Sequence, residues 1–76
     1  MSEDTKSEGM AQAERERRLE RYEAFAASVR EDYGATQRQM DDLRAKDRVK
    51  TATYRQLYAY KCTLGEILDR LEECGL

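Results

Sequence analysis

The sequence predicts an all-α fold, a coiled-coil-like antiparallel hairpin of two helices that dimerises into a four-helix bundle. Three observations support this prediction. Apolar residues recur at alternating steps of three and four in two separate segments. The two patterns stay in register when the chain is folded back on itself near residue 48. The 76 residues include no proline to break either helix, and this length holds one small domain.

The first helix is expected from about residue 11 to about residue 45, where Ala, Glu, Arg, Gln and Leu favour a helix. Residues 1–9 are rich in Ser, Glu, Asp, Thr, Lys and Gly, and we expect them to form a disordered lead-in. The single helical domain is then residues 10–76. The heptad seam of the first helix consists of Leu19, Tyr22, Ala26, Val29, Tyr33, Thr36, Met40 and Leu43.

The second helix is expected over residues 52–74. Its seam consists of Tyr54, Leu57, Lys61, Leu64, Leu68 and Leu71, and a second ridge through Tyr60, Ile67 and Cys74 widens the apolar arc. A wide arc is typical of a helix that contacts more than one neighbour. The candidates for an oligomer interface are Leu57, Tyr60, Leu64, Ile67, Leu68 and Leu71.

The ends of the second helix carry capping signals. Thr53, three residues before Gln56, predicts a capping box, and Thr51 is the alternative cap. Gly75 suits the left-handed position just past the end. Residues 46–50 lie between the two periodic segments without Gly or Pro, so one continuous helix is the alternative to a hairpin.

Antiparallel pairing sets Leu43 beside Tyr54 and places two glycines, Gly34 and Gly65, opposite each other. This predicts either a close approach of the two backbones or two tolerated surface glycines. Lys61 occupies a seam position, where a polar residue fixes the register or reaches the edge through its long stem.

A lone two-helix hairpin has too little core to stand alone, so we expect a homodimer, either parallel or antiparallel. The first helix is expected to extend past the end of the second by about ten residues, over 11–20. This overhang is interpreted as a solvated helix; an arm that crosses to a second subunit is the alternative.

Charge is unevenly spread along the chain. Lys plus Arg is 14 and Asp plus Glu is 16, a balance that argues against a generally basic nucleic-acid binder. Residues 66–73 are acidic and the expected hairpin tip is basic. The basic tip candidates are Arg44, Lys46, Arg48, Lys50 and Arg55.

The composition points away from an enzyme. No histidine is present to act as a general base, and the four glycines form no phosphate-binding loop. Cys62 and Cys74 would lie about 18 Å apart on one helix, too far for a disulfide, and two cysteines do not make a zinc site. We therefore expect no cofactor, no metal and no catalytic residue. No apolar run could span a membrane, and the polar start lacks a secretory signal, so a cytoplasmic location is expected.

The sequence therefore favours a non-enzymatic protein–protein interaction and oligomerisation module whose further partner is unknown. The alternative is a helical hairpin that binds nucleic acid through its basic tip. In length and outline the predicted fold is similar to small dimeric helical-hairpin RNA-binding regulators of plasmid copy number, a resemblance that implies RNA binding but rests on no sequence motif.

Overall fold

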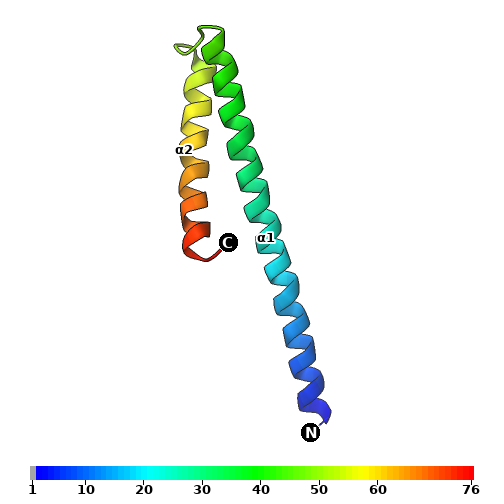
Figure 1. The fold of residues 1–76 in the computed structure, drawn as a ribbon. Helices are drawn as coiled ribbons and strands as arrows, with labels where there is room; N and C mark the ends of the chain where they lie inside the picture. Colours follow the sequence, from blue (N-terminus) through cyan, green and yellow to red (C-terminus); the bar gives the residue numbers. More distant parts are fainter. Residues whose placement is uncertain (1) are drawn as a thin grey trace.

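The computed structural model describes residues 2–76, with side chains from residue 9 onward. Two helices are present, α1 (Ser2–Ala45) and α2 (Ala52–Glu73), and a turn over residues 46–51 joins them. Helix α2 folds back antiparallel along α1 (Figure 1). The predicted all-α hairpin is confirmed, and the alternative of one continuous helix is wrong.

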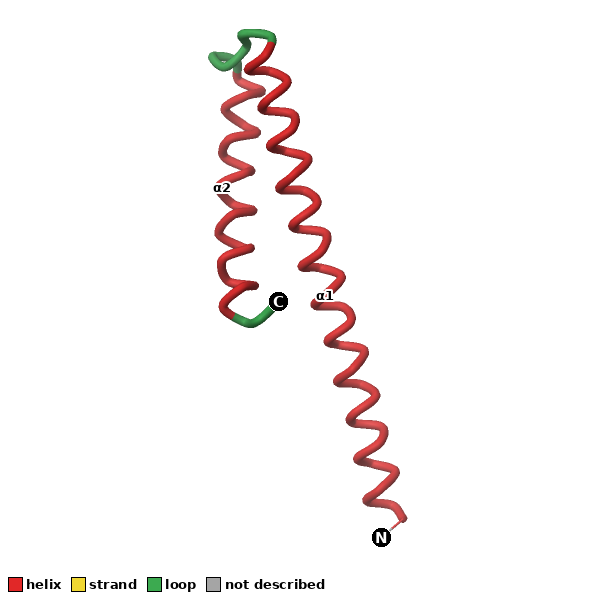
Figure 2. The backbone as a smooth tube through the Cα atoms, in the orientation of Figure 1, coloured by secondary structure: helices red, strands yellow, loops and turns green. Residues whose placement is uncertain are grey.

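Helix α2 covers only the C-terminal half of α1. The C-terminus lies beside the middle of α1, and the N-terminal half of α1 extends away from the hairpin (Figure 2). The molecule is therefore elongated, with dimensions of 69 × 17 × 17 Å. Helix α1 begins at Ser2 and not near residue 11, so residues 2–9 continue the helix instead of forming a separate lead-in. A polar composition removes packing partners, but it does not end a helix that is nucleated further along the chain.

A Schellman motif ends α1 without a glycine. Asp47 adopts a left-handed conformation with φ of 56°. Its N–H donates to the carbonyl of Arg44, and the N–H of Arg48 donates to the carbonyl of Leu43 at 2.8 Å. Asp tolerates the left-handed region better than most non-glycine residues, which explains how the chain reverses in a segment without Gly or Pro.

Helix α2 begins and ends with side-chain and backbone caps. The hydroxyl of Thr51 accepts a hydrogen bond from the N–H of Tyr54 at 3.2 Å, so Thr51 is the N-cap and the predicted Thr53 capping box is wrong. The Thr51 hydroxyl also donates to the carbonyl of Arg48, which ties the cap to the turn. At the other end, Gly75 has the predicted left-handed conformation with φ of 80°, and the N–H of Leu76 donates back to the carbonyl of Leu71.

The seam between the helices is buried over the middle of the hairpin. The hydroxyl of Thr36, the polar member of the α1 seam, donates to the carbonyl of Asp32 at 2.8 Å, so its burial leaves no unpaired group. Leu19 and Tyr22 continue the seam in sequence but are 49% and 59% exposed, because α2 ends before reaching them. The buried residues are Ala26, Val29, Thr36, Met40 and Leu64.

The two glycines do not form a close contact. A Cβ at Gly65 would lie 3.7 Å from Cε2 of Tyr33, an ordinary van der Waals distance, and one at Gly34 would meet only the guanidinium of Arg38 at 3.3 Å. Neither would touch the backbone of the other helix. The alternative of two tolerated glycines therefore holds, and the predicted close approach is wrong.

Gly65→Ala is expected to raise the melting temperature, with a gain in stability of about 0.5 to 1 kcal/mol, because alanine lowers the entropy cost of ordering the helix. Gly34→Ala serves as a second variant, since the flexible Arg38 side chain can give way. Thermal unfolding followed by circular dichroism measures both. A lower melting temperature for Gly65→Ala would mean that the helices approach more closely here than the structure shows.

Candidate interaction surface

Residues seven apart in a helix share a side, because the helix turns by about 100° per residue. On this basis the hairpin has two different long sides. One side carries rows from both helices that are polar or aromatic except for Leu68, and it is called the closed side. Its rows are Arg30, Gln37 and Arg44 in α1, and Tyr54, Lys61 and Leu68 in α2.

Polar contacts between the helices cover the seam on the closed side. Nη2 of Arg44 donates to the hydroxyl of Tyr54 at 2.9 Å, and this hydrogen bond raises the pKa of Arg44 above its ordinary value. Nζ of Lys61 lies 5.7 Å from the ring centroid of Tyr33, a cation–π distance. The closed side therefore presents charged and polar groups along the seam.

The opposite long side has an apolar row on α2 and no such polar cover. Tyr60, Ile67 and Cys74 are spaced by seven residues, and Tyr60 is 48% exposed. At the foot of the hairpin, Tyr22 and Phe25 of α1 continue the row, and these two side chains line an apolar hollow together with Leu71, Cys74 and Leu76. We call Tyr22, Phe25, Tyr60, Ile67 and Cys74 the open flank.

The six interface candidates predicted from sequence fall into different environments. Leu64 is buried within the hairpin, so it belongs to the core of one chain. Tyr60 is exposed and Ile67 is half-buried, both on the open flank. The remaining candidates, Leu57, Leu68 and Leu71, are half-buried along the seam.

Two members of the open flank, Tyr22 and Phe25, were not among the predicted interface residues. The spacing of Tyr22 makes it a seam residue, so the pattern alone predicts that it is buried. Its exposure can be predicted only when the length of α2 is also considered. The predicted overhang over residues 11–20 held the required signal, since it places the end of the second helix beside Tyr22. The hollow that contains both residues agrees with that placement.

The basic tip lies around the turn, at the end of the hairpin opposite the C-terminus (Figure 1). Two of its five residues have partners within the hairpin, since Arg44 bonds to Tyr54 and Lys46 forms an ion pair with Asp42 at 3.0 Å. The other three tip residues are exposed, and no salt bridge in the described part of the chain includes them. They are Arg48, Lys50 and Arg55.

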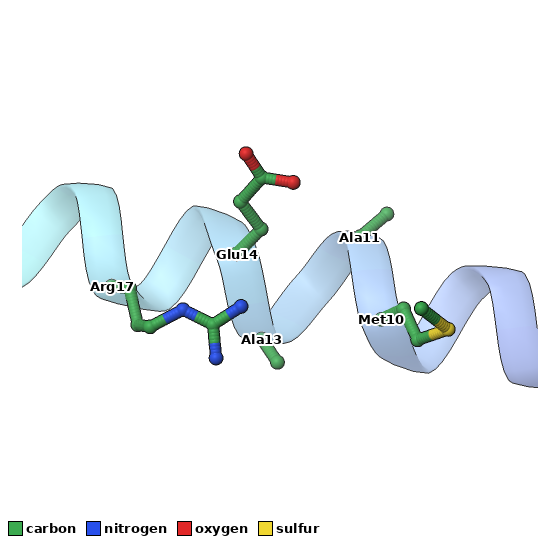
Figure 3. Close-up of a pocket in the computed structure, with 5 residues that line it drawn as sticks. All are labelled: Met10, Ala11, Ala13, Glu14 and Arg17. Atoms are coloured by element: carbon green, nitrogen blue, oxygen red, sulfur yellow. The ribbon is translucent and has the colours of Figure 1, made fainter.

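A hollow on the N-terminal part of α1 does not have the form of a binding site. All of its lining residues come from this one helix, and their side chains project from different sides of it (Figure 3). Glu14, which points away from Arg17, is held instead by an ion pair with Arg18 at 3.0 Å. A ligand site needs polar groups that converge, and these diverge.

Within residues 9–76, where side chains are described, no group of three or more Cys, Asp or Glu residues is arranged to hold a metal ion. Cys62 and Cys74 are exposed free thiols. Neither helix, over the described residues, is long and apolar enough to cross a membrane. Comparison with known proteins gives no counterpart, since no family model, curated protein or solved structure matches the chain.

Proposed function

We propose that this protein is a non-enzymatic self-association module, in which two hairpins pack through their open flanks into a homodimeric four-helix bundle. The dimer then presents its outer helix faces to a further protein partner. The open flank of α2 is the surface that supports this proposal, because it is the apolar row that α1 leaves uncovered.

The exposed surface of the single chain is the observation that carries the proposal. The hairpin exposes 6404 Å², whereas a compact monomer of 8.9 kDa exposes only about 4,800 Å². Its radius of gyration of 19.6 Å likewise exceeds the roughly 11 Å of a compact chain of this length. The excess of about 1,600 Å² includes the N-terminal part of α1 that extends beyond α2, and a standard interface needs about 800 Å² from each chain.

The small core of the hairpin also favours assembly. Of the described residues, four apolar ones are buried, and just one of these is on α2. A domain of this size with so small a core normally needs further burial to be stable. Packing two open flanks together supplies it, because Tyr60 and Ile67 would then lie in the centre of a four-helix bundle.

Analytical ultracentrifugation of the full chain at micromolar concentration tests the proposal. A dimer in equilibrium with little monomer is the expected result. A well-folded monomer across the whole concentration range, with full helical circular dichroism, would contradict it.

The basic tip supports a second candidate, nucleic-acid binding. Residues 44–61 carry six basic side chains against Asp47 alone among acids. Yet Arg44 and Lys46 are engaged within the hairpin, and Tyr58 at 57% exposure is the aromatic neighbour with the most open ring. Stacking on bases usually needs more such platforms.

We expect no submicromolar binding to RNA or DNA at physiological salt. Three free basic residues neutralise about three phosphates, which gives a slope of roughly −2.7 for log affinity against log salt on duplex DNA. Weak binding at low salt should therefore disappear as salt is raised. Fluorescence anisotropy with labelled RNA and DNA measures this. Submicromolar binding that is abolished by Arg48→Glu with Lys50→Glu would favour the nucleic-acid candidate instead.

A further inference from the structure

We infer that the two hairpins of the dimer pack antiparallel, with the basic tip of one chain beside the acidic last turns of α2 in the other. This inference rests on the proposed self-association and names the partner of the basic tip, a second copy of this chain. The juxtaposition also defines which parts of the two open flanks meet.

The charge of α2 runs against its own dipole. The first turn holds no acid and contains Arg55, whereas the last turn contains Glu72 and Glu73 with Arg70 as its basic residue. Acidic groups stabilise helix N-termini and basic groups stabilise C-termini, so each of these placements is unfavourable in an isolated helix. An antiparallel copy of α2 relieves both, because it sets a negative helix end beside each positive one.

The two charged ends of one hairpin cannot compensate each other. Residues 44–61 have a local balance of +5 and residues 66–73 of −3. The exposed tip residues Arg48 and Lys50 and the acids Glu72 and Glu73 lie at opposite ends of α2, a helix of 22 residues and therefore about 33 Å long. Since the Debye length is about 8 Å at physiological ionic strength, their mutual attraction within one chain is screened.

The acids at the end of α2 have no partner within the described hairpin. Its ion pairs join Glu14 to Arg18 and Asp42 to Lys46. A parallel dimer would place two acidic ends together and two basic tips together, which is repulsive at both ends. An antiparallel dimer makes both ends attractive. The four exposed acids concerned are Glu66, Asp69, Glu72 and Glu73.

The apolar row of the open flank fits the same arrangement. Its members on α2 are seven residues apart, so an antiparallel copy related by a two-fold axis near Thr63 and Leu64 sets Tyr60 of each chain against Ile67 of the other. The same axis brings the start of α2 level with Cys74 of the second copy. The aromatic and aliphatic members of the row therefore alternate across the interface, and the charged ends meet beyond them.

The orientation of the two hairpins can be tested by whether salt weakens or strengthens the dimer. Raising sodium chloride from about 50 to about 500 mM should weaken an antiparallel dimer several-fold, because salt screens the attraction between unlike ends. The dissociation constant from sedimentation measures this. A dimer that becomes tighter with salt, as screened like charges would require, overturns the inference.

A distance measurement tests the orientation independently. Spin labels at Ala52→Cys, in a chain with Cys62→Ser and Cys74→Ser, mark the start of α2 without altering its charge. In an antiparallel dimer the two labels are about 30 Å or more apart, and in a parallel dimer they lie within about 15 Å. A short distance overturns the inference but leaves the dimer intact, whereas a monomer overturns the proposed self-association itself.

Charge reversal gives a matched pair of variants. Arg55→Glu should weaken the dimer about three- to tenfold, since each surface ion pair contributes a few tenths to 1 kcal/mol and occurs twice. Glu suits the first turn of α2, so this variant does not weaken the helix itself. Adding Glu73→Lys should restore wild-type affinity. Failure of the second substitution to rescue the first would count against the antiparallel contact.

Discussion

Replacing Tyr60 by Glu is expected to convert the proposed dimer into monomers, whereas replacing Tyr58 by Glu should leave that dimer intact. The two tyrosines are two residues apart on α2 and have similar exposure, 48% and 57%. Only Tyr60 lies on the open flank, and Tyr58 projects from the other side of the helix. The pair therefore compares the same chemical change on two faces of one element.

The expected effect is large because a glutamate on the open flank would be buried without a partner. At about 2 kcal/mol for each of two copies, the dissociation constant should rise about a thousandfold for Tyr60→Glu. For Tyr58→Glu we expect less than a threefold change. Sedimentation over a dilution series measures both values.

Circular dichroism at the same concentrations separates two ways of losing the dimer. A hairpin that remains helical as a monomer and one that unfolds on dissociation are both compatible with the interface, and the second shows that folding is coupled to assembly. If the two variants changed the dissociation constant equally, whether by much or by little, the open flank would not be where the chains meet.

The hairpin could be predicted because its main signals are local and repeated. The heptad steps around Val29, Met40 and Leu64 occur several times in each helix, so one exception such as Thr36 does not obscure them. The register agreement between two segments then fixes the antiparallel pairing. Of the two seams, the structure buries the members at the centre of the contact, leaves others such as Leu57 half-buried, and exposes Leu19 and Tyr22, where α2 has ended.

The turn could be placed but not described from sequence. The residue in the left-handed conformation after a helix is usually a glycine, but here Asp47 adopts that conformation. Thr51 and not Thr53 is the N-cap of α2 because of where the chain leaves the Schellman motif at the end of α1. That point is set by the left-handed conformation of Asp47. Both details are therefore consequences of one backbone dihedral angle that the residue types do not specify.

The predicted close approach of the two glycines was wrong because antiparallel pairing of the sequence gives the height of a residue along the hairpin. It does not say whether that residue faces the other helix. Gly34 and Gly65 follow the seam residues Tyr33 and Leu64 directly, so each is turned about 100° away from the centre of the contact. At that angle the surfaces of the two helices diverge. The same geometry divides the predicted interface residues, since it places Tyr60 and Ile67 on the open flank and leaves Leu64 within the seam.

Leu64→Ala is expected to destabilise the folded state by about 2 to 4 kcal/mol, and Leu19→Ala by less than about 0.5 kcal/mol. Both leucines occupy seam positions in sequence. Leu64 is 4% exposed against α1, so its removal leaves a cavity that a two-layer structure has little means to fill, whereas Leu19 is 49% exposed beyond the end of α2. Alanine also has the higher helix propensity, which offsets part of the small loss at Leu19.

Urea unfolding at one fixed protein concentration measures this difference, because the stability of a dimer depends on concentration. A cost at Leu19 as large as that at Leu64 would show that the N-terminal part of α1 is covered in solution. In the antiparallel arrangement the overhang of each chain extends past the basic tip of the other and stays exposed, so an expensive Leu19→Ala variant would argue against that arrangement. It would favour the arm that crosses to a second subunit.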